Sequence, residues 1–95
     1  MTVTLCVLLW AKDGREDALV DYEDRVLALL PDHGARVIHR MRSEGRDRAP
    51  LDVQVIEFPD DDAFEAFMAD SRRTALADLR ERAIERTEVV RVAIV

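Results

Sequence analysis

Hydrophobic and polar positions follow the same order twice along this chain. In each half, an apolar stretch typical of a strand comes first, an amphipathic stretch typical of a helix follows, and a second apolar stretch ends the half. The first half contains TVTLCVLLW and ARVIHRM, and the second contains LDVQVIEF and TEVVRVAIV. The repetition predicts six elements in the order βαββαβ.

Six elements in this order indicate a ferredoxin-like sandwich of the α+β class, in which two helices cover one face of a four-stranded antiparallel sheet. The chain has 95 residues, so we expect a single domain over residues 1–95. We expect the two inner strands of the pattern at about residues 36–42 and 51–58. The last strand is predicted at residues 88–95.

The first strand, residues 3–10, is apolar on both of its sides. Val3, Leu5, Val7 and Leu9 alternate with Thr4, Cys6, Leu8 and Trp10. A strand of this kind is buried on both faces, whereas two helices cover only one. A second copy of the same sheet is the simplest cover for the other face, which predicts a homodimer that forms through the sheet faces.

The two helices are predicted from their apolar faces and their ends. Glu16 and Asp17 suit the first turn of the first helix, which should end near Pro31. An aspartate run at residues 60–62 should cap the second helix, and the apolar spacing slips at residues 70–74. We expect a break there, with Ser71 capping a segment that ends near residue 86. The expected inward-facing residues are Leu19, Tyr22, Val26, Leu29 and Leu30 in the first helix, and Phe64, Phe67, Met68, Leu76, Leu79 and Ala83 in the second.

Composition narrows the classes of partner. The net charge of −6 and the pI of about 4.8 argue against nucleic acid and anionic membranes, because both need a basic surface. Cys6 is the only cysteine, and its place in an apolar strand predicts a buried, unreactive thiol. No secretory leader and no membrane-spanning run are visible, so we expect a cytoplasmic protein.

Three phrases carry a resemblance to known proteins: YEDRVLALLPDHGARVIHR, VIEFPDDDAFEAF and ALADLRERA. Together they resemble the small dimeric α+β-barrel proteins, most closely the domain-of-unknown-function family thirteen-thirty. The resemblance implies a ferredoxin-like protomer and a homodimer whose two sheets face each other. Relatives in the wider superfamily include cofactor-independent monooxygenases, muconolactone isomerases, polyketide cyclases and ligand-sensing domains. Fold alone does not choose among these functions.

His39 and Gln54 are the first pair of candidate site residues. A histidine facing a barrel interior can shuttle protons near neutral pH. For His39, the structural explanation is favoured: a hydrogen-bonded or partly exposed residue on an edge strand. If the hairpin loop is centred near residues 46 and 47, Gln54 lies opposite His39 on the same face. A slip of one residue in the register would separate them.

Three further residues are candidates for binding a ligand. Glu57 is either a carboxylate at the mouth of a pocket or one half of a salt bridge, with Arg40 as a possible partner. Trp10 and Tyr22 are amphipathic aromatics that either line a pocket between helix and sheet or belong to the core.

Other polar residues have structural explanations. His33 suits the C-terminal end of the first helix. The arginines at 72, 73 and 80 are interpreted as a solvated helix face, with contact to an anionic ligand or to the partner subunit as the alternative. We expect no metal site and no cofactor, because no ligand spacing, phosphate-binding glycine loop or dinucleotide fingerprint is present.

Three functions remain open. The first is binding of a small apolar or aromatic molecule between sheet and helices. The second is a cofactor-independent monooxygenase, isomerase or cyclase that uses His39 for proton transfer and Gln54 to polarise a carbonyl or enolate. The third is an interaction module without a ligand. A filled pocket would favour the module, an open apolar pocket would favour binding, and convergence of His39, Gln54 and a tyrosine or glutamate would favour catalysis.

Overall fold

The computed structural model describes all 95 residues and has the predicted βαββαβ order, with the second helix divided into three. Short 3₁₀ turns at Leu30–His33 and Arg46–Arg48 precede the second and third strands. The helices and strands, in chain order, are β1 (Val3–Ala11), α1 (Glu16–Leu27), β2 (Arg36–Arg42), β3 (Asp52–Phe58), α2 (Asp61–Met68), α3 (Ser71–Thr74), α4 (Ala77–Ala83) and β4 (Ile84–Arg91).

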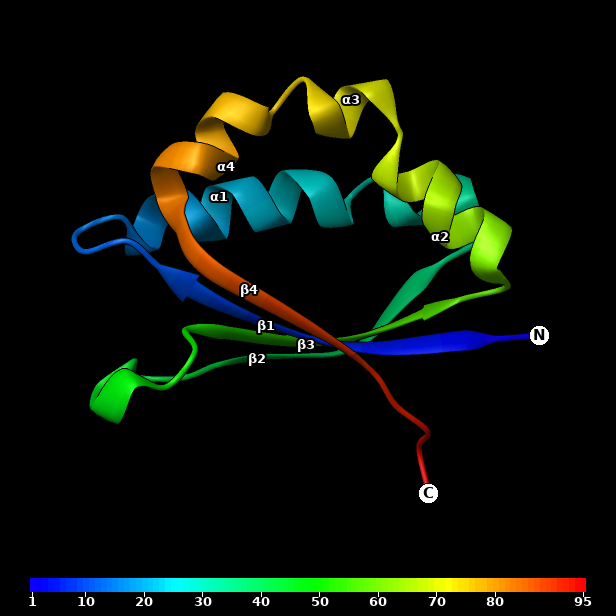
Figure 1. Cartoon of the computed structure of the whole chain (residues 1–95), viewed down its shortest axis with the longest axis horizontal. Coiled ribbons are helices and arrows are strands. Elements are labelled where there is room, and N and C mark those ends of the chain that lie inside the picture. Colours follow the sequence, from blue (N-terminus) through cyan, green and yellow to red (C-terminus); the bar gives the residue numbers. More distant parts are fainter.

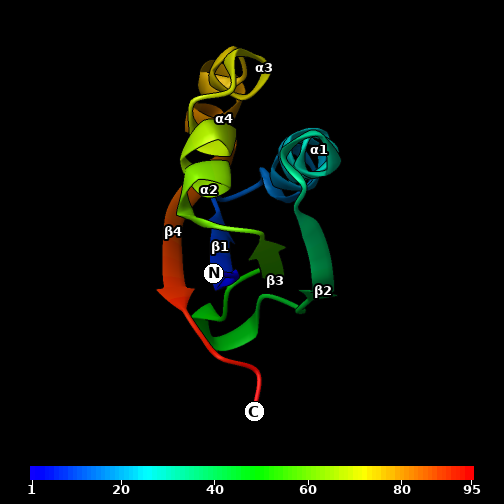
Figure 2. The same cartoon turned by 90° about the vertical axis from the view of Figure 1, so that its right-hand side faces the viewer.

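The four strands form one antiparallel sheet in the order β2-β3-β1-β4. All the helices lie on one side of this sheet, and the C-terminal residues turn away on the other side (Figure 1). Seen from the end, α1 lies over the β2 side of the sheet, and α2, α3 and α4 lie over the β4 side (Figure 2). The predicted α+β ferredoxin-like fold is confirmed. None of the helices has the length and apolarity needed to cross a lipid bilayer.

The core lies between the helices and the sheet. Residues that alternate along β1 and β3 point toward the helices and are buried, and Leu19 and Val26 of α1 pack against them. Leu19 is fully buried, which fits its place in the middle of the apolar stripe of α1. This packing covers one face of the sheet, as the helical periodicity predicted.

The end of the second helical region differs from the prediction. The break after α2 is confirmed, but Asp70 caps α3 in place of Ser71, through a hydrogen bond from the backbone amide of Arg72. The last helix ends at Ala83, and β4 runs from Ile84 to Arg91 and not over residues 88–95. Pairing with β1 is the reason, because the ladder between these two strands already begins at the Ala11–Ile84 pair.

The face of the sheet away from the helices carries apolar side chains in two rows across the strands. One row is Val90, Cys6, Val55 and His39, and the other is Glu88, Leu8, Val53 and Met41. Cys6 and Leu8 in the centre are half-buried, whereas 49% of Val90 and 50% of Met41 are exposed. No helix covers these two rows, which we call the open face. Its apolar character agrees with the two-sided pattern of β1.

Candidate functional site

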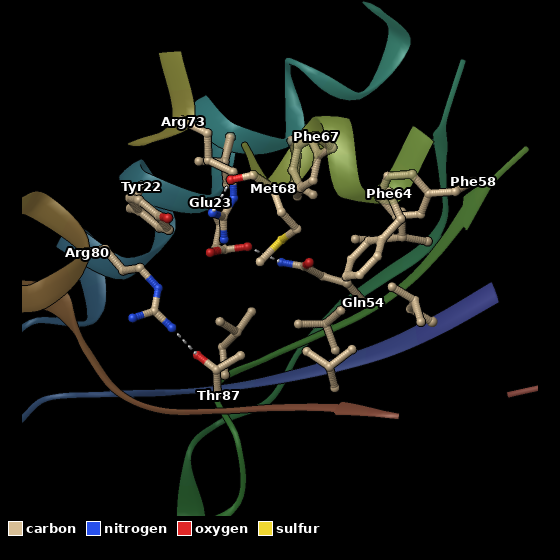
Figure 3. Close-up of a pocket in the computed structure, with 17 residues that line it drawn as sticks. Tyr22, Glu23, Gln54, Phe58, Phe64, Phe67, Met68, Arg73, Arg80 and Thr87 are labelled. Carbon is tan, nitrogen blue, oxygen red and sulfur yellow. Dashed lines mark hydrogen bonds between the residues drawn. The ribbon is translucent and has the colours of Figure 1, made fainter. Parts of the chain in front are cut away.

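A cavity of about 210 Å³ lies between the helices and the sheet. Twelve of its seventeen lining residues are hydrophobic, and the polar ones project into it from helices on one side and strands on the other (Figure 3). The lining from the strands is Leu5, Val7, Leu9, Gln54, Ile56, Phe58, Thr87 and Val89. The lining from the helices is Tyr22, Glu23, Val26, Leu27, Phe64, Phe67, Met68, Arg73 and Arg80.

Glu23 and Gln54 form a buried polar pair at the centre of the cavity. The side-chain amide of Gln54 donates a hydrogen bond of 2.8 Å to Glu23 Oε1, and both residues are at least nine-tenths buried. Burial raises the pKa of the Glu23 carboxyl, and the nearby carboxylate of Asp52 raises it further. The hydrogen bond from Gln54 and the charges of Arg40 and Arg73 act in the opposite direction on this pKa. Glu23 therefore keeps its proton to a higher pH than a surface glutamate does.

A buried ion pair lies beside Glu23. Asp52 is completely buried and accepts hydrogen bonds from Arg40, at 2.8 Å from Nη2 and 3.1 Å from Nε. Arg40 also donates to Asp24 at 2.6 Å. The hydrogen bonds with Asp52 are the main cause that raises the pKa of Arg40. The pair fixes the position of β2 against β3 and keeps a negative charge near Glu23.

Two arginines and a tyrosine form the polar end of the cavity. Arg73 donates from Nη1 to the backbone carbonyl of Met68 at 3.3 Å, and its guanidinium lies 5.5 Å from the centre of the Phe67 ring. Arg80 donates from Nη2 to the hydroxyl of Thr87 at 3.1 Å. Burial raises the pKa of Tyr22, while the charges of the two arginines lower it. The phenol and both arginine side chains therefore line the same part of the cavity (Figure 3).

Of the sequence-predicted site residues, Tyr22 and Gln54 line the cavity, whereas Trp10, His39 and Glu57 do not. The expected pairing of His39 with Gln54 is wrong. The register of β2 shifts between Val37 and His39, so Arg40 lies opposite Gln54 and His39 lies opposite Val55 on the open face. A β-bulge of one residue is enough to move a side chain to the other side of a sheet.

Glu57 and Trp10 have structural partners elsewhere. Glu57 accepts a hydrogen bond of 3.2 Å from Arg36, so the predicted salt bridge forms, but with Arg36 in place of Arg40. The indole of Trp10 donates to the backbone carbonyl of Arg48 at 2.9 Å, and the guanidinium of Arg86 lies 4.7 Å from the centre of its ring. Trp10 borders a separate polar hollow near the β2–β3 loop.

The remaining polar candidates divide into two groups. His33 and Arg72 both bind Asp70, at 2.8 Å and 2.7 Å, and Arg72 also contacts Asp32 at 2.8 Å. These contacts join the turn after α1 to the start of α3. Arg73 and Arg80, in contrast, are half-buried and line the cavity, so their interpretation as a solvated helix face is wrong.

Glu23 is the site residue that the sequence reasoning missed. The signal was present, because Glu23 lies four residues after Leu19 and three before Val26, within the apolar stripe of the first helix. A carboxylate in such a stripe is buried by the same packing as its neighbours. Its partner Gln54 follows the inward alternation of β3.

The family of this chain is identified by a match to a protein-family model. The model of the family described as Domain of unknown function (DUF1330) matches residues 11–94. The chain belongs to the DUF1330 family. This DUF1330 protein has no match among the curated proteins.

Solved structures show the same fold at low sequence identity. A dimeric protein of unknown function with a ferredoxin-like fold, from Bacteroides fragilis, is 17% identical with a TM-score of 0.72, over 98% of this chain and 96% of that one. A dabb family protein with a ferredoxin-like fold, from Mesorhizobium loti, is 17% identical with a TM-score of 0.69, over 99% and 97%. A candidate antibiotic biosynthesis monooxygenase from Bacteroides thetaiotaomicron is 8% identical with a TM-score of 0.77, over 98% and 89%. These similarities establish the fold.

Proposed function

We propose that this DUF1330 protein binds a small apolar or aromatic molecule in the cavity between sheet and helices, and that it does so as a homodimer. The observation that supports binding is an open cavity whose walls are mainly apolar and whose few polar groups converge. Cavities for drug-sized ligands have volumes of about 300–1,000 Å³. The volume of about 210 Å³ found here therefore suits a molecule of one or two rings.

The open face supports the homodimer. Two rows of mainly apolar side chains cross all four strands there, and no helix covers them. Contiguous apolar patches of this kind mark interaction sites in proteins. A second copy presents the same rows, so a symmetric contact between two copies would cover both open faces at once. The Bacteroides fragilis protein of the same fold is a dimer.

A thermal-shift screen tests the binding proposal. The screen uses small aromatic acids, amides, quinols and phenols against wild type, His39→Ala, Met68→Trp and Ala66→Trp. A ligand that binds only the folded state raises the melting temperature. Met68 lines the cavity from its partly exposed rim, so Met68→Trp should block the cavity and abolish the shift. Ala66 and His39 do not line the cavity, so their replacement should leave the shift intact. A shift that survives in Met68→Trp would place the ligand elsewhere, and no hit in the whole screen would count against binding.

Light scattering at micromolar concentration tests the homodimer. Wild type should have the mass of two chains, and Val55→Arg should have the mass of one, because it places a charge in the middle of the open face. Ala66→Arg adds the same charge on the exposed side of α2 and should leave the dimer intact. A monomeric wild type would refute the homodimer without affecting the cavity.

A second candidate function is catalysis by proton transfer in the same cavity, without a cofactor. Glu23, Gln54 and Tyr22 converge there, so the carboxyl group of Glu23 takes the place that the sequence suggested for His39. A carboxyl group with a raised pKa is suited to exchange protons near neutral pH. Oxygenation, isomerisation and cyclisation all remain open, and one neighbour of the same fold is the candidate monooxygenase. Turnover of a ligand found in the screen, abolished in Glu23→Gln with binding retained, would establish this function.

A further inference from the structure

Arg73 and Arg80 are half-buried at the cavity, and neither forms an ion pair with a carboxylate. The arginines that do pair are Arg25, Arg36, Arg40, Arg42, Arg46, Arg72, Arg86 and Arg91. The rest, Arg15, Arg48 and Arg82, are exposed to water. Arg73 and Arg80 are thus the two guanidinium groups that have neither a carboxylate partner nor full hydration.

The hydrogen-bond donors of these two arginines exceed the acceptors around them. The Nε atom of Arg73 is buried and has no hydrogen-bond partner, and its Nη1 atom has only the long contact with the Met68 carbonyl. Arg80 has one hydrogen bond, to the neutral hydroxyl of Thr87. A buried donor without a partner is costly, so a site of this kind gains from an acceptor supplied by a ligand.

The two arginines lie at one end of the cavity. In Figure 3, both are on the side of Tyr22, whereas Phe58 and Phe64 are at the opposite end. The influence of both guanidinium charges on the Tyr22 phenol agrees with this placement. The cavity therefore has a cationic end and an aromatic end.

We infer that the ligand of this cavity is a carboxylate with an apolar, preferably aromatic, body: the carboxylate binds Arg73 and Arg80, and the body packs toward Phe58 and Phe64. This inference rests on the proposed function and adds the chemical class of the ligand. A guanidinium fork matches the geometry of a carboxylate, and hydrogen bonds between charged groups are stronger than those between neutral groups.

Binding of the carboxylate should be linked to protonation of Glu23. The groups that act on Glu23 are Gln54 and Asp52 on β3, Arg40 on β2 and Arg73 on α3. A bound carboxylate adds negative charge near Glu23. It also offsets the positive charge of Arg73, which lowers the pKa of Glu23 in the empty cavity. The pKa of Glu23 rises further when the ligand binds, so binding takes up a proton and weakens as the pH rises.

Calorimetric titration with 2-naphthoate and 2-naphthamide tests the inference, because these compounds share one body and differ in charge. Wild type should bind the carboxylate at least about tenfold more tightly, a factor that corresponds to about 1.4 kcal/mol. Arg73→Met and Arg80→Met should each reduce this preference and leave the affinity for the amide nearly unchanged. Arg82→Met, on the exposed side of α4, is the matched control and should keep the full preference.

The outcomes separate this inference from the proposed function. Equal affinity for the two compounds in wild type would overturn the inference and leave the binding proposal intact. Failure of both compounds to bind would count against the cavity as a binding site and therefore against both proposals. Titration of 2-naphthoate at increasing pH above 4.5, the ordinary value for glutamate, should show a falling affinity in wild type but not in Glu23→Gln. An identical pH dependence in the two proteins would refute the role of Glu23.

Discussion

The pair of Arg40 and Asp52 gives the sharpest prediction about what holds the site together. Replacing Arg40 with Met keeps much of the side-chain volume but leaves Asp52 charged and completely buried. Three contacts between the two residues, at 2.8, 3.1 and 3.3 Å, are lost at once. Removing one partner of a buried ion pair costs about 3–5 kcal/mol. Arg42 lies 3.8 Å from Asp52 and compensates in part, so we expect about 3 kcal/mol.

Replacing the other partner of the ion pair, Asp52, should lower the free energy of unfolding by less. In Asp52→Asn, Arg40 remains charged, but 23% of its side chain is exposed and it keeps its contact with Asp24. The amide oxygen that replaces one carboxylate oxygen still accepts a hydrogen bond. The loss therefore lies at the lower end of the range of about 1.5–3 kcal/mol that a hydrogen bond to a charged group contributes. The same substitution removes a negative charge near Glu23, so the pKa of Glu23 should move back toward its ordinary value. The two variants therefore differ in stability although they break the same ion pair.

Urea unfolding at one fixed protein concentration measures both losses, because the stability of the proposed dimer would depend on concentration. Arg25→Met is the control. Arg25 and Asp21 form an ion pair four residues apart on α1 with both side chains more than half exposed, so its loss should cost at most about 0.5 kcal/mol. A loss in Arg40→Met that equals the loss in Arg25→Met would refute the reasoning. A greater loss in Asp52→Asn than in Arg40→Met would refute the proposed asymmetry.

Three further measurements follow from the structure. The pKa of Glu23 is raised above its ordinary 4.5 in the folded state. Wild type should therefore lose stability relative to Glu23→Gln as the pH rises through and above 4.5. Equal melting temperatures of the two proteins at every pH would contradict this expectation. Leu19→Ala should cost about 2–5 kcal/mol in urea unfolding because Leu19 is fully buried, and the half-buried Leu29→Ala should cost less. Asp60→Ala should cost about 1 kcal/mol in urea unfolding, because Asp60 accepts a capping hydrogen bond at the start of α2. An equal loss in Asp62→Ala, two residues along the same run, would show that charge, and not the cap, is responsible.

Much of the fold was predictable because its signals are local. The apolar runs of β1 and β3, the apolar stripe of α1 and the aspartates at the start of α2 each specify an element within a short window of sequence. The start of β4 was not predictable in this way. Its first residues carry few apolar side chains and become a strand by pairing with β1.

The candidate site was predicted only in part. Tyr22 was found because its inward position follows directly from helical periodicity. Gln54 was named through an expected pairing with His39 that does not form, although Gln54 does line the cavity. His39 was assigned to the wrong face because a bulge in β2 leaves no clear sign in the sequence. Glu23 was overlooked because its charge suggested an exposed residue, although its position in the helical stripe did not.

The order of the elements, the face that each helix buries and the apolar character of both sides of β1 follow from the sequence alone, because they depend on residue type and period. Which polar groups meet depends on the folded chain. Glu23 and Gln54 are 31 positions apart, and the arginines of α3 and α4 reach the cavity because the second helical region bends twice above the sheet. Contacts of this length depend on strand register and helix placement, which no local pattern encodes.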